Sequence, residues 1–360
     1  MRTEATEVQE KLPIHLSTTL RCYPHLLLYA DFKEDFQGQH ITNILEGVSP
    51  QILSSHEDFD LYRRLKQSGR GSLDSSELSS AGGQSNGPTG RPGNPGWKLD
   101  KWKFIPMVIQ TLHEQPDKKW YVFVETDTYV FWSTLLKYLS ALNHSQQYYI
   151  GSQMQIGDII FAYGGSGFVL SNAAIRRAVD LLQDHQEEWE KVTDGHWAGD
   201  CVLGKALRDT ETPVLWAWPR LWCYPTVSYH HMRPEAIKDI WEFEQKWLSS
   251  TGHNQSAAFL RHKDVFEQYI MPRIKSPKSD WDNESSETVG QLESPADCEK
   301  ECLQRASCVQ YAFQSDGNCT ISSGPYLGEP RDGTQSGWIF EKFENFTTSM
   351  APCNDESWII

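Results

Sequence analysis

The sequence lacks long apolar runs and is poor in basic residues. A bilayer-spanning helix needs about 20 consecutive apolar residues, and no stretch of the 360 residues approaches that length, so none is predicted within the chain. Lys and Arg number 33 against 48 Asp and Glu, which gives a formal charge of −15. A surface this acidic repels phosphate backbones, so a nucleic-acid partner is excluded, whereas a divalent cation is compatible with it.

An apolar leader is also lacking, because residues 1–13 are polar and acidic, unlike a signal peptide. Two other features nevertheless indicate an oxidising, secretory compartment. The chain has eight cysteines, and it has five N-x-S/T sequons, at Asn143, Asn254, Asn283, Asn318 and Asn345. We therefore expect a type II membrane protein of the Golgi lumen, attached through a membrane anchor that is absent from this chain.

The composition is sufficient for about two folded domains. Apolar residues make up 39% of the chain and aromatic residues 12%, which excludes wholesale disorder. Strand and helix patterns alternate over most of the chain and predict an α/β layered domain. The predicted boundaries are 1–250 for this domain, with a flexible Gly/Ser/Pro-rich insertion at 67–96, then 251–286 for a linker, 287–345 for a small Cys-rich domain and 346–360 for a C-terminal tail.

The sharpest candidate for chemistry is an acid-x-acid motif, Glu125-Thr126-Asp127, which follows the predicted strand at 120–124. Carboxylates at the carboxyl end of a strand in an open α/β sheet lie where ligands bind. Side chains two residues apart on an extended segment face the same way, and two hard oxygen ligands suit Mg²⁺ or Mn²⁺ holding a diphosphate. The alternative is a solvated strand end, because acid-x-acid is a common pattern.

Three further motifs are individually ambiguous. The glycine-rich turn Tyr163–Gly167 permits close approach to a ligand but is also typical of a hairpin. Asp200 opens a predicted helix, where it is either an N-cap or a general base, and Cys201 beside it is expected to be buried or disulfide-bonded. In Ser228–His231 one histidine is either a nitrogen ligand for a metal or an exposed polar residue.

Taken in order, the motifs GWKLDKWKFIPMV, WYVFVETDTYVFW, FAYGGSGFVLS, GDCVLGKAL and YPTVSYHHM resemble the β-1,3-galactosyltransferase and Fringe-type glycosyltransferase family. The resemblance covers residues 2–247 and is greatest to core 1 synthase-like proteins of fungal type. It implies a GT-A fold, which is a Rossmann-like mixed sheet flanked by helices. It further implies a UDP-sugar donor, a glycan or glycoprotein acceptor, Mn²⁺ (or Mg²⁺) as cofactor, and inversion at the anomeric carbon.

The same resemblance implies roles for individual residues. It makes Asp127 and His230 metal ligands, Asp31, Glu125 and Asp127 donor-binding residues, Asp200 the general base, and Gly164 and Gly165 part of the acceptor side.

Three departures from the family pattern stand beside these assignments. Gly199 occupies the position of the first acid in the base motif, and the metal motif is Glu-Thr-Asp in place of three aspartates. Residues 2–7 look like the segment that follows the family's first strand, and that strand, at the centre of the nucleotide pocket, is expected to be missing from this chain.

The C-terminal cysteines Cys298, Cys302, Cys308 and Cys319 follow a C-x3-C-x5-C-x10-C pattern. A zinc site is conceivable, but residues 290–360 contain no His and the compartment is expected to be oxidising, so disulfides are favoured. The pattern resembles a short PAN/Apple domain, a disulfide-rich α+β module that binds proteins or glycans. That resemblance implies the pairs Cys298–Cys319 and Cys302–Cys308.

Two functions from different classes follow. The first is an inverting, Mn²⁺-dependent β-1,3-glycosyltransferase with UDP-galactose as the favoured donor. The second is a catalytically degenerate glycan- or protein-binding protein that acts through its PAN-like module. The presence of Asp127, Asp200 and His230 favours the enzyme, and the missing first strand favours the binding protein.

Overall fold

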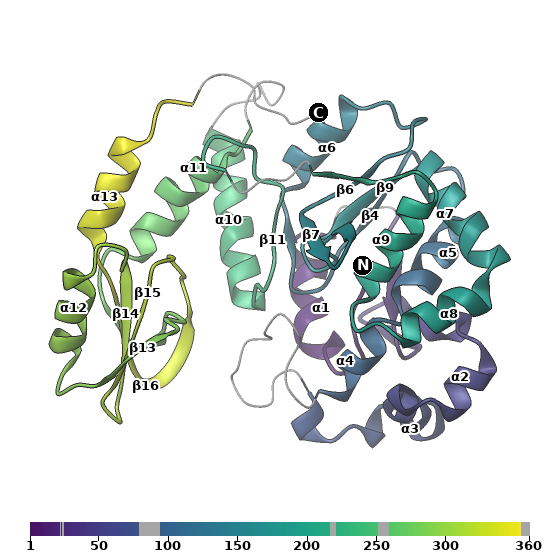
Figure 1. Ribbon diagram of the computed structural model, residues 1–360, viewed down its shortest axis with the longest axis horizontal. Helices are drawn as coiled ribbons and strands as arrows, with labels where there is room; N and C mark the ends of the chain where they lie inside the picture. Colours follow the sequence, from purple (N-terminus) through teal and green to yellow (C-terminus); the bar gives the residue numbers. More distant parts are fainter. Residues whose placement is uncertain (22, 24, 79–93, 217–220, 251–258, 354–360) are drawn as a thin grey trace. The chain divides into compact units, whose positions relative to one another are not determined.

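The computed structural model describes residues 1–21, 23, 25–78, 94–216, 221–250 and 259–353. These residues form two compact units, drawn in Figure 1: residues 1–216 with 225–250 and 259, and residues 221–224 with 260–353. None of the described helices has both the length and the apolarity that a bilayer crossing requires.

The first unit is built around a mixed four-stranded sheet of order β10-β6-β9-β4. β9 runs antiparallel to both β4 and β6, whereas β6 and β10 are parallel. The predicted mixed α/β architecture is therefore confirmed. The strands are β4 (Trp120–Phe123), β6 (Tyr149–Gly151), β9 (Phe168–Ser171) and β10 (Val214–Trp216).

Helices cover both faces of this sheet, because the strands are apolar on both sides. Phe123 and Phe168 stack on one face in a core with α5, α7 and α9, and Val124 and Val169 pack on the other face with α6. Figure 1 shows these helices around the sheet. The helices are α1 (Val8–Ser17), α2 (Pro50–Ser55), α3 (Asp60–Ser68), α4 (Pro95–Asp100), α5 (Phe104–Glu114), α6 (Trp132–Ser140), α7 (Asn172–Asp184), α8 (Gln186–Asp194), α9 (Gly199–Asp209) and α10 (Pro234–Ser250).

The first three residues join this sheet to a smaller one. The smaller sheet has the order β1-β3-β2 and consists of β1 (Leu28–Ala30), β2 (Glu34–Phe36) and β3 (Gln39–Asn43). Arg2 forms parallel bridges with both Tyr29 and Glu125, and its N–H donates to the carbonyl of Val124 at 2.8 Å. This pairing places the Arg2 side chain beside the acids that follow β4.

Within the insertion predicted at 67–96, the described residues at both ends form helices or 3-10 turns, so the expectation of a flexible loop is wrong for these ends. Residues 79–93 lie outside the described residues. Before them, Arg70 pairs with Glu34 and donates to the carbonyl of Ala5 at 2.6 Å. After them, α4 starts directly after Asn94. Specific polar contacts thus hold a segment whose composition indicates only flexibility. Short 3-10 helices complete this region and the one before it: η1 (Ile44–Gly47), η2 (Glu57–Phe59), η3 (Gly69–Ser72) and η4 (Ser75–Glu77).

The linker predicted over 251–286 is folded wherever it is described, so that prediction is wrong for residues 260–286. Its last part forms β12, which pairs antiparallel with β16 at the edge of a five-stranded sheet. Trp281 on β12 donates to the carbonyl of Leu327 at 2.6 Å and packs with Ile274 and Trp338. Residues 251–258 lie outside the described residues. The elements of the segment are α11 (His262–Val265), the π-helical turn η5 (Phe266–Ile270), η6 (Met271–Arg273) and β12 (Lys278–Asp282).

The second unit has an antiparallel sheet of order β12-β16-β14-β15-β13, accompanied by the helices α11, α12 and α13. Both implied disulfides are present, Cys298–Cys319 between α12 and β15 and Cys302–Cys308 at the end of α12. A third, Cys223–Cys353, lies in the same unit and was not assigned from the sequence. The remaining elements are β13 (Glu287–Gln291), α12 (Pro295–Gln304), β14 (Gln310–Gln314), β15 (Asn318–Ser322), β16 (Glu329–Trp338) and α13 (Phe340–Ser349).

The unit is therefore larger than the predicted 287–345 domain. It includes residues 260–286 and 221–224, and α13 continues beyond the predicted end at residue 345. Cys353 belongs to it through the third disulfide, so the described part of the predicted tail, 346–353, is not a separate segment.

Candidate functional site

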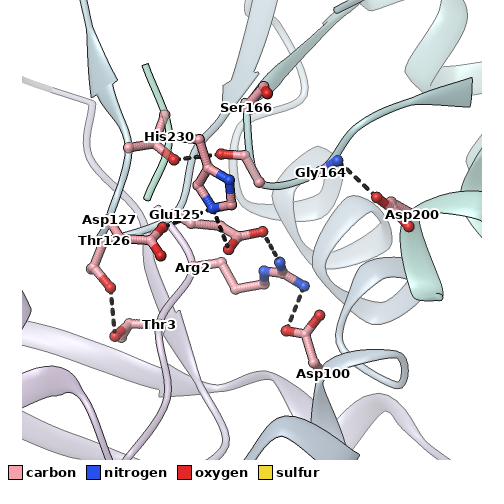
Figure 2. Close-up of polar contacts among 12 residues, drawn as sticks. Arg2, Thr3, Asp100, Glu125, Thr126, Asp127, Gly164, Ser166, Asp200 and His230 are labelled. Atoms are coloured by element: carbon pink, nitrogen blue, oxygen red, sulfur yellow. Dashed lines mark hydrogen bonds and ion pairs between the residues drawn. The ribbon is translucent and has the colours of Figure 1, made fainter. Parts of the chain in front are cut away.

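A cavity of about 370 Å³ in the first unit gathers most of the predicted site residues. Five of them line it: Glu125, Asp127, Gly165, Asp200 and His230. Figure 2 shows Glu125, Asp127 and His230 on one side and Asp200 on another. The motifs that the sequence left separate therefore form one site.

The pairing of two short strands brings Asp127 and His230 together. β5 (Tyr129–Val130) follows the acid motif, and it pairs antiparallel with β11 (Ser228–Tyr229), which ends just before His230. The N–H of Met232 also donates to the carbonyl of Asp127 at 2.8 Å. As a result, Asp127 Oδ1 lies 3.1 Å from His230 Nε2.

Asp127 and His230 fit a divalent cation. Asp127 Oδ1 and His230 Nδ1 are buried and have no hydrogen-bond partner, and the 3.1 Å approach to His230 Nε2 is not aligned for a hydrogen bond. One ligand atom each from Asp127, His230 and His231 lie within 4.8 Å of one another. A carboxylate oxygen with imidazole nitrogens is a donor set that Mn²⁺ accepts. The sequence left either histidine of the pair as a possible nitrogen ligand, and the resemblance selected His230. The structure also brings His231 close, on a left-handed backbone with φ of 60°.

The electrostatics of the pair agree with this fit. Burial opposes ionisation of Asp127, but the charges of His230 and Lys11 outweigh it and hold the pKa of Asp127 well below its usual range. Burial likewise opposes protonation of His230, whereas the carboxylates of Asp127 and Glu125 raise its pKa. Asp127 is thus held as an anion, which suits a cation ligand, whereas His230 must give up its proton when a cation binds.

Gly164 and Gly165 lie between the Asp127/His230 pair and Asp200. A Cβ on Gly165 would overlap the His230 ring, lying 2.6 Å from its Nε2. A Cβ on Gly164 would lie 2.7 Å from Phe104 Cζ, and the Gly164 N–H donates to Asp200 Oδ2 at 2.8 Å (Figure 2). The two glycines are therefore required for close packing against a candidate metal ligand and a candidate base.

The glycine-rich turn does not close a hairpin. The strand before it, β8 (Ile159–Ala162), pairs with β7 (Gln153–Ile156), whereas β9 after it pairs with β4 and β6. The turn thus crosses between two sheets, and the hairpin alternative for Tyr163–Gly167 is wrong. Close approach of the backbone to functional side chains explains the glycines.

Asp200 lies in the first turn of α9, and Ala198 is the N-cap. Its Oδ1 accepts from the Cys201 N–H and its Oδ2 from the Gly164 N–H, both at 2.8 Å. Burial raises the pKa of Asp200 to about 6, although these hydrogen bonds and the charge of Arg2 oppose the rise. A carboxylate that titrates near neutral pH is suited to general base catalysis. The neighbouring Cys201 is a buried free thiol. Of the two predictions for it, the buried cysteine is confirmed and the disulfide is not formed.

The absence of a side chain at Gly199 has a packing reason. A Cβ there would lie 2.5 Å from Phe104 Cδ2 and 2.6 Å from the carbonyl oxygen of Lys101. The acid that the family resemblance leads one to expect at this position would not fit. Asp200 therefore stands beside backbone and an aromatic ring, which contributes to its burial.

Arg2 is a site residue that the sequence reasoning missed. Its guanidinium pairs with Glu125 and with Asp100, the latter at 2.7 Å, and lies 4.0 Å from the centre of the Phe104 ring (Figure 2). Glu125 Oε2 remains 3.8 Å from His230 Nε2. Arg2 thus fixes Glu125 beside the candidate metal pair. No local pattern marks Arg2, because its position depends on pairing with Tyr29 and Glu125.

Helix α1 contributes two further residues. Lys11 Nζ lies 2.8 Å from Glu7 Oε1 and 3.7 Å from Asp127 Oδ2, and it lines the cavity. His15, one helical turn later, is buried and its Nε2 lies 2.9 Å from the carbonyl of Thr126. Burial lowers the pKa of His15 to about 4, so the ring is neutral at pH 7. The only sequence signal for these two residues was their spacing of four, which puts Lys11 and His15 on one face of a helix.

The structure does not bring Asp31 to the cavity. The side chain is fully buried at the end of β1, and its Oδ1 accepts from the N–H of Ala5 at 2.6 Å. Asp31 therefore holds the segment that leads from Arg2 into α1. Asp31 does not line the cavity, and its Oδ2 is buried without a hydrogen-bond partner, so its implied donor-binding role stays a prediction.

The cavity thus lies at the ends of strands in a mixed α/β unit and is lined by a possible Asp/His cation site and by a buried carboxylate. Residues 105–215 of the chain match the family model described as Fringe-like. That match supports a glycosyltransferase of the Fringe type, and the mixed α/β architecture is consistent with a GT-A-like Fringe domain. The matched segment contains the acid motif, the two glycines and Asp200, whereas α1 and His230 lie outside it.

Proposed function

We propose that the protein is an inverting, Mn²⁺-dependent glycosyltransferase. It transfers a sugar, with galactose favoured, from a UDP-sugar to a hydroxyl of a glycan or glycoprotein acceptor in β-1,3 linkage. The observation that carries the proposal is that Asp127, His230 and Asp200 line one cavity. The Fringe-like match over residues 105–215 supports the reaction class.

On this proposal the donor diphosphate binds on the Asp127 side of the cavity. Asp127 and His230, with His231, would hold Mn²⁺ (or Mg²⁺), which when bound offsets the negative charge that grows on the UDP leaving group. Lys11 adds a positive charge beside Asp127. Arg2 keeps Glu125 in place next to this group.

Asp200 performs the proton transfer. A sugar hydroxyl is a poor nucleophile, so a carboxylate must accept its proton while the new C1–O bond forms and the bond from C1 to the diphosphate oxygen breaks. With a pKa of about 6, Asp200 is mostly ionised at neutral pH and still basic enough to accept that proton. Attack from the side opposite the diphosphate inverts the anomeric configuration.

The proposal also covers the function of the second unit and the cellular compartment of the protein. An α-helix on an antiparallel sheet, joined by Cys298–Cys319 and Cys302–Cys308, supports a PAN/Apple-like module that binds proteins or glycans. Three disulfides favour an oxidising compartment, for which we propose the Golgi lumen and a type II membrane protein.

A donor screen tests the proposal. The protein is incubated with Mn²⁺, a panel of UDP-sugars and a panel of glycan acceptors, and released UDP and transferred sugar are both measured. We expect one UDP-sugar to be consumed, chelation to stop the reaction, and NMR of the product to show the inverted anomer. If no donor is hydrolysed or transferred and UDP does not bind, the degenerate binding protein is the better account.

A further inference from the structure

One wall of the cavity is apolar and exposed. Trp197 and Met154 line the cavity with 53% and 40% of their surface exposed. Ile156, which lies on β7 with Met154, also lines the cavity. Large apolar side chains left in water at the edge of a cavity mark binding surfaces. The roles of Asp127, His230 and Asp200 leave these three side chains unexplained.

Close packing fixes this wall in place. The β7–β8 hairpin packs onto the start of α9 through Phe161, Ala198 and Cys201, with Ile156 against them. Phe161 approaches α9 closely because Gly204 has no side chain, and a Cβ there would lie 2.3 Å from the Phe161 Cβ. Met154 and Trp197, from two separate elements, are therefore held on one surface.

The Trp197 indole is also oriented by its neighbours. The His196 ring lies nearly parallel to it, with an interplanar angle of 14° and centroids 6.2 Å apart. His196 itself is fixed by the Ala198 N–H, which donates to its Nδ1 at 3.0 Å. The indole thus lines the cavity while 53% of its surface stays exposed.

The position of this wall relative to the base identifies its occupant. Trp197 precedes Asp200 by three residues, just before α9, whereas the His230 ring of the metal pair packs against Gly165. The acceptor hydroxyl must come within hydrogen-bond distance of Asp200, so the ring that bears it must lie beside the neighbours of Asp200. The C–H face of a pyranose is apolar and packs well on an indole.

We propose that Trp197, with Met154 and Ile156, forms the acceptor subsite, on which the reacting pyranose of the glycan acceptor stacks. This inference rests on the proposed glycosyltransferase function. It goes beyond that function by naming the residues that recognise the acceptor and by separating them from the donor residues around Asp127.

The variant Trp197→Ala tests the subsite, and Leu136→Ala is a matched control. Leu136 is 54% exposed on α6 and does not line the cavity. Two readouts are used: steady-state KM for acceptor and for donor, and saturation-transfer NMR with methyl glycosides of several monosaccharides in the presence of UDP and Mn²⁺. Trp197→Phe tests whether an aromatic face is sufficient.

We expect Trp197→Ala to raise the acceptor KM about tenfold, as loss of a stacked aromatic surface does. The donor KM should stay the same, Trp197→Phe should recover most of the acceptor affinity, and Leu136→Ala should behave like the wild type. In the NMR experiment a methyl glycoside that binds the wild type should lose its signal with Trp197→Ala. An unchanged acceptor KM, or equal rises in donor and acceptor KM, would overturn the subsite.

The NMR arm separates this inference from the proposed function. A methyl glycoside that binds the wild type but not Trp197→Ala supports the subsite even if no donor is transferred, in which case only the enzymatic proposal fails. If no methyl glycoside binds the wild type, or if binding survives in Trp197→Ala, the subsite is refuted whatever the transfer assay shows.

Discussion

Asp200→Asn should make the stability of the protein less dependent on pH and should lower its activity, because the same burial that suits Asp200 to act as a base destabilises its charged form. Asp200 accepts the N–H groups of Gly164 and Cys201 through two different oxygens, whereas the single amide oxygen of Asn can keep only one of these hydrogen bonds. In acid the variant should therefore be less stable than the wild type, by about 1 to 3 kcal/mol.

The pH dependence gives the size of the effect. Burial raises the pKa of Asp200 from 3.8 to about 6, a difference of about 3 kcal/mol between the two protonation states. The folded protein holds this proton more tightly than the unfolded chain. The stabilisation is therefore complete below a pH of about 4 and is lost as the pH rises through about 6. Asn does not titrate, so the variant should gain up to about 3 kcal/mol on the wild type between pH of about 4 and about 7.

Activity should move in the opposite direction. Loss of the base should lower kcat/KM by about 10² to 10⁴, and the wild-type kcat/KM should rise with pH and level off above about 6. The assay combines urea unfolding at several pH values with transfer kinetics, and Asp184→Asn, an exposed carboxylate on α7, is the control. The reasoning is refuted if Asp200→Asn transfers sugar at the normal rate, or if its stability relative to the wild type does not change with pH.

Three further predictions concern packing, the disulfides and glycosylation. Gly165→Ala should displace the His230 ring and weaken Mn²⁺ binding, measured by calorimetry, at least about tenfold, whereas Gly71→Ala, where a Cβ meets nothing within 4 Å, should not; equal affinities would contradict the packing argument. Replacing both cysteines of Cys298–Cys319 by Ala should lower the free energy of unfolding of the second unit by about 3 kcal/mol in urea titrations, and an unchanged stability would count against this disulfide. In protein secreted from eukaryotic cells, glycopeptide mapping should find Asn283 unmodified, because its Nδ2 is buried and donates to two backbone carbonyls; a glycan there would be incompatible with this fold.

Those parts of the site that depend on local sequence were predictable. Asp127 follows an apolar strand, Asp200 opens a helix, and the glycine turn lies between them in the chain. The spacing of Cys298 to Cys319 likewise indicated disulfides, and two form with the implied pairing. In each case the residue type and its neighbours carry the information.

What could not be predicted depends on pairing between distant segments. Arg2 reaches Glu125 only because its backbone bridges both Tyr29 and Glu125. The strand β12 has the sequence Lys-Ser-Asp-Trp-Asp, which is polar because it lies at a sheet edge, and composition alone therefore indicated a linker. Asp31 has the residue type of a donor ligand, yet the fold turns it toward the N–H of Ala5.

The central claim is that Asp127 and His230 hold a divalent cation that binds the donor diphosphate. Calorimetric titration of UDP into the protein, with MnCl₂ and with EDTA, tests it most directly when Asp127→Ala is run in parallel. We predict that UDP binds in the presence of Mn²⁺ and that its affinity falls at least about tenfold both with EDTA and with Asp127→Ala. UDP binding that is the same with and without Mn²⁺, and the same in Asp127→Ala, would contradict the account.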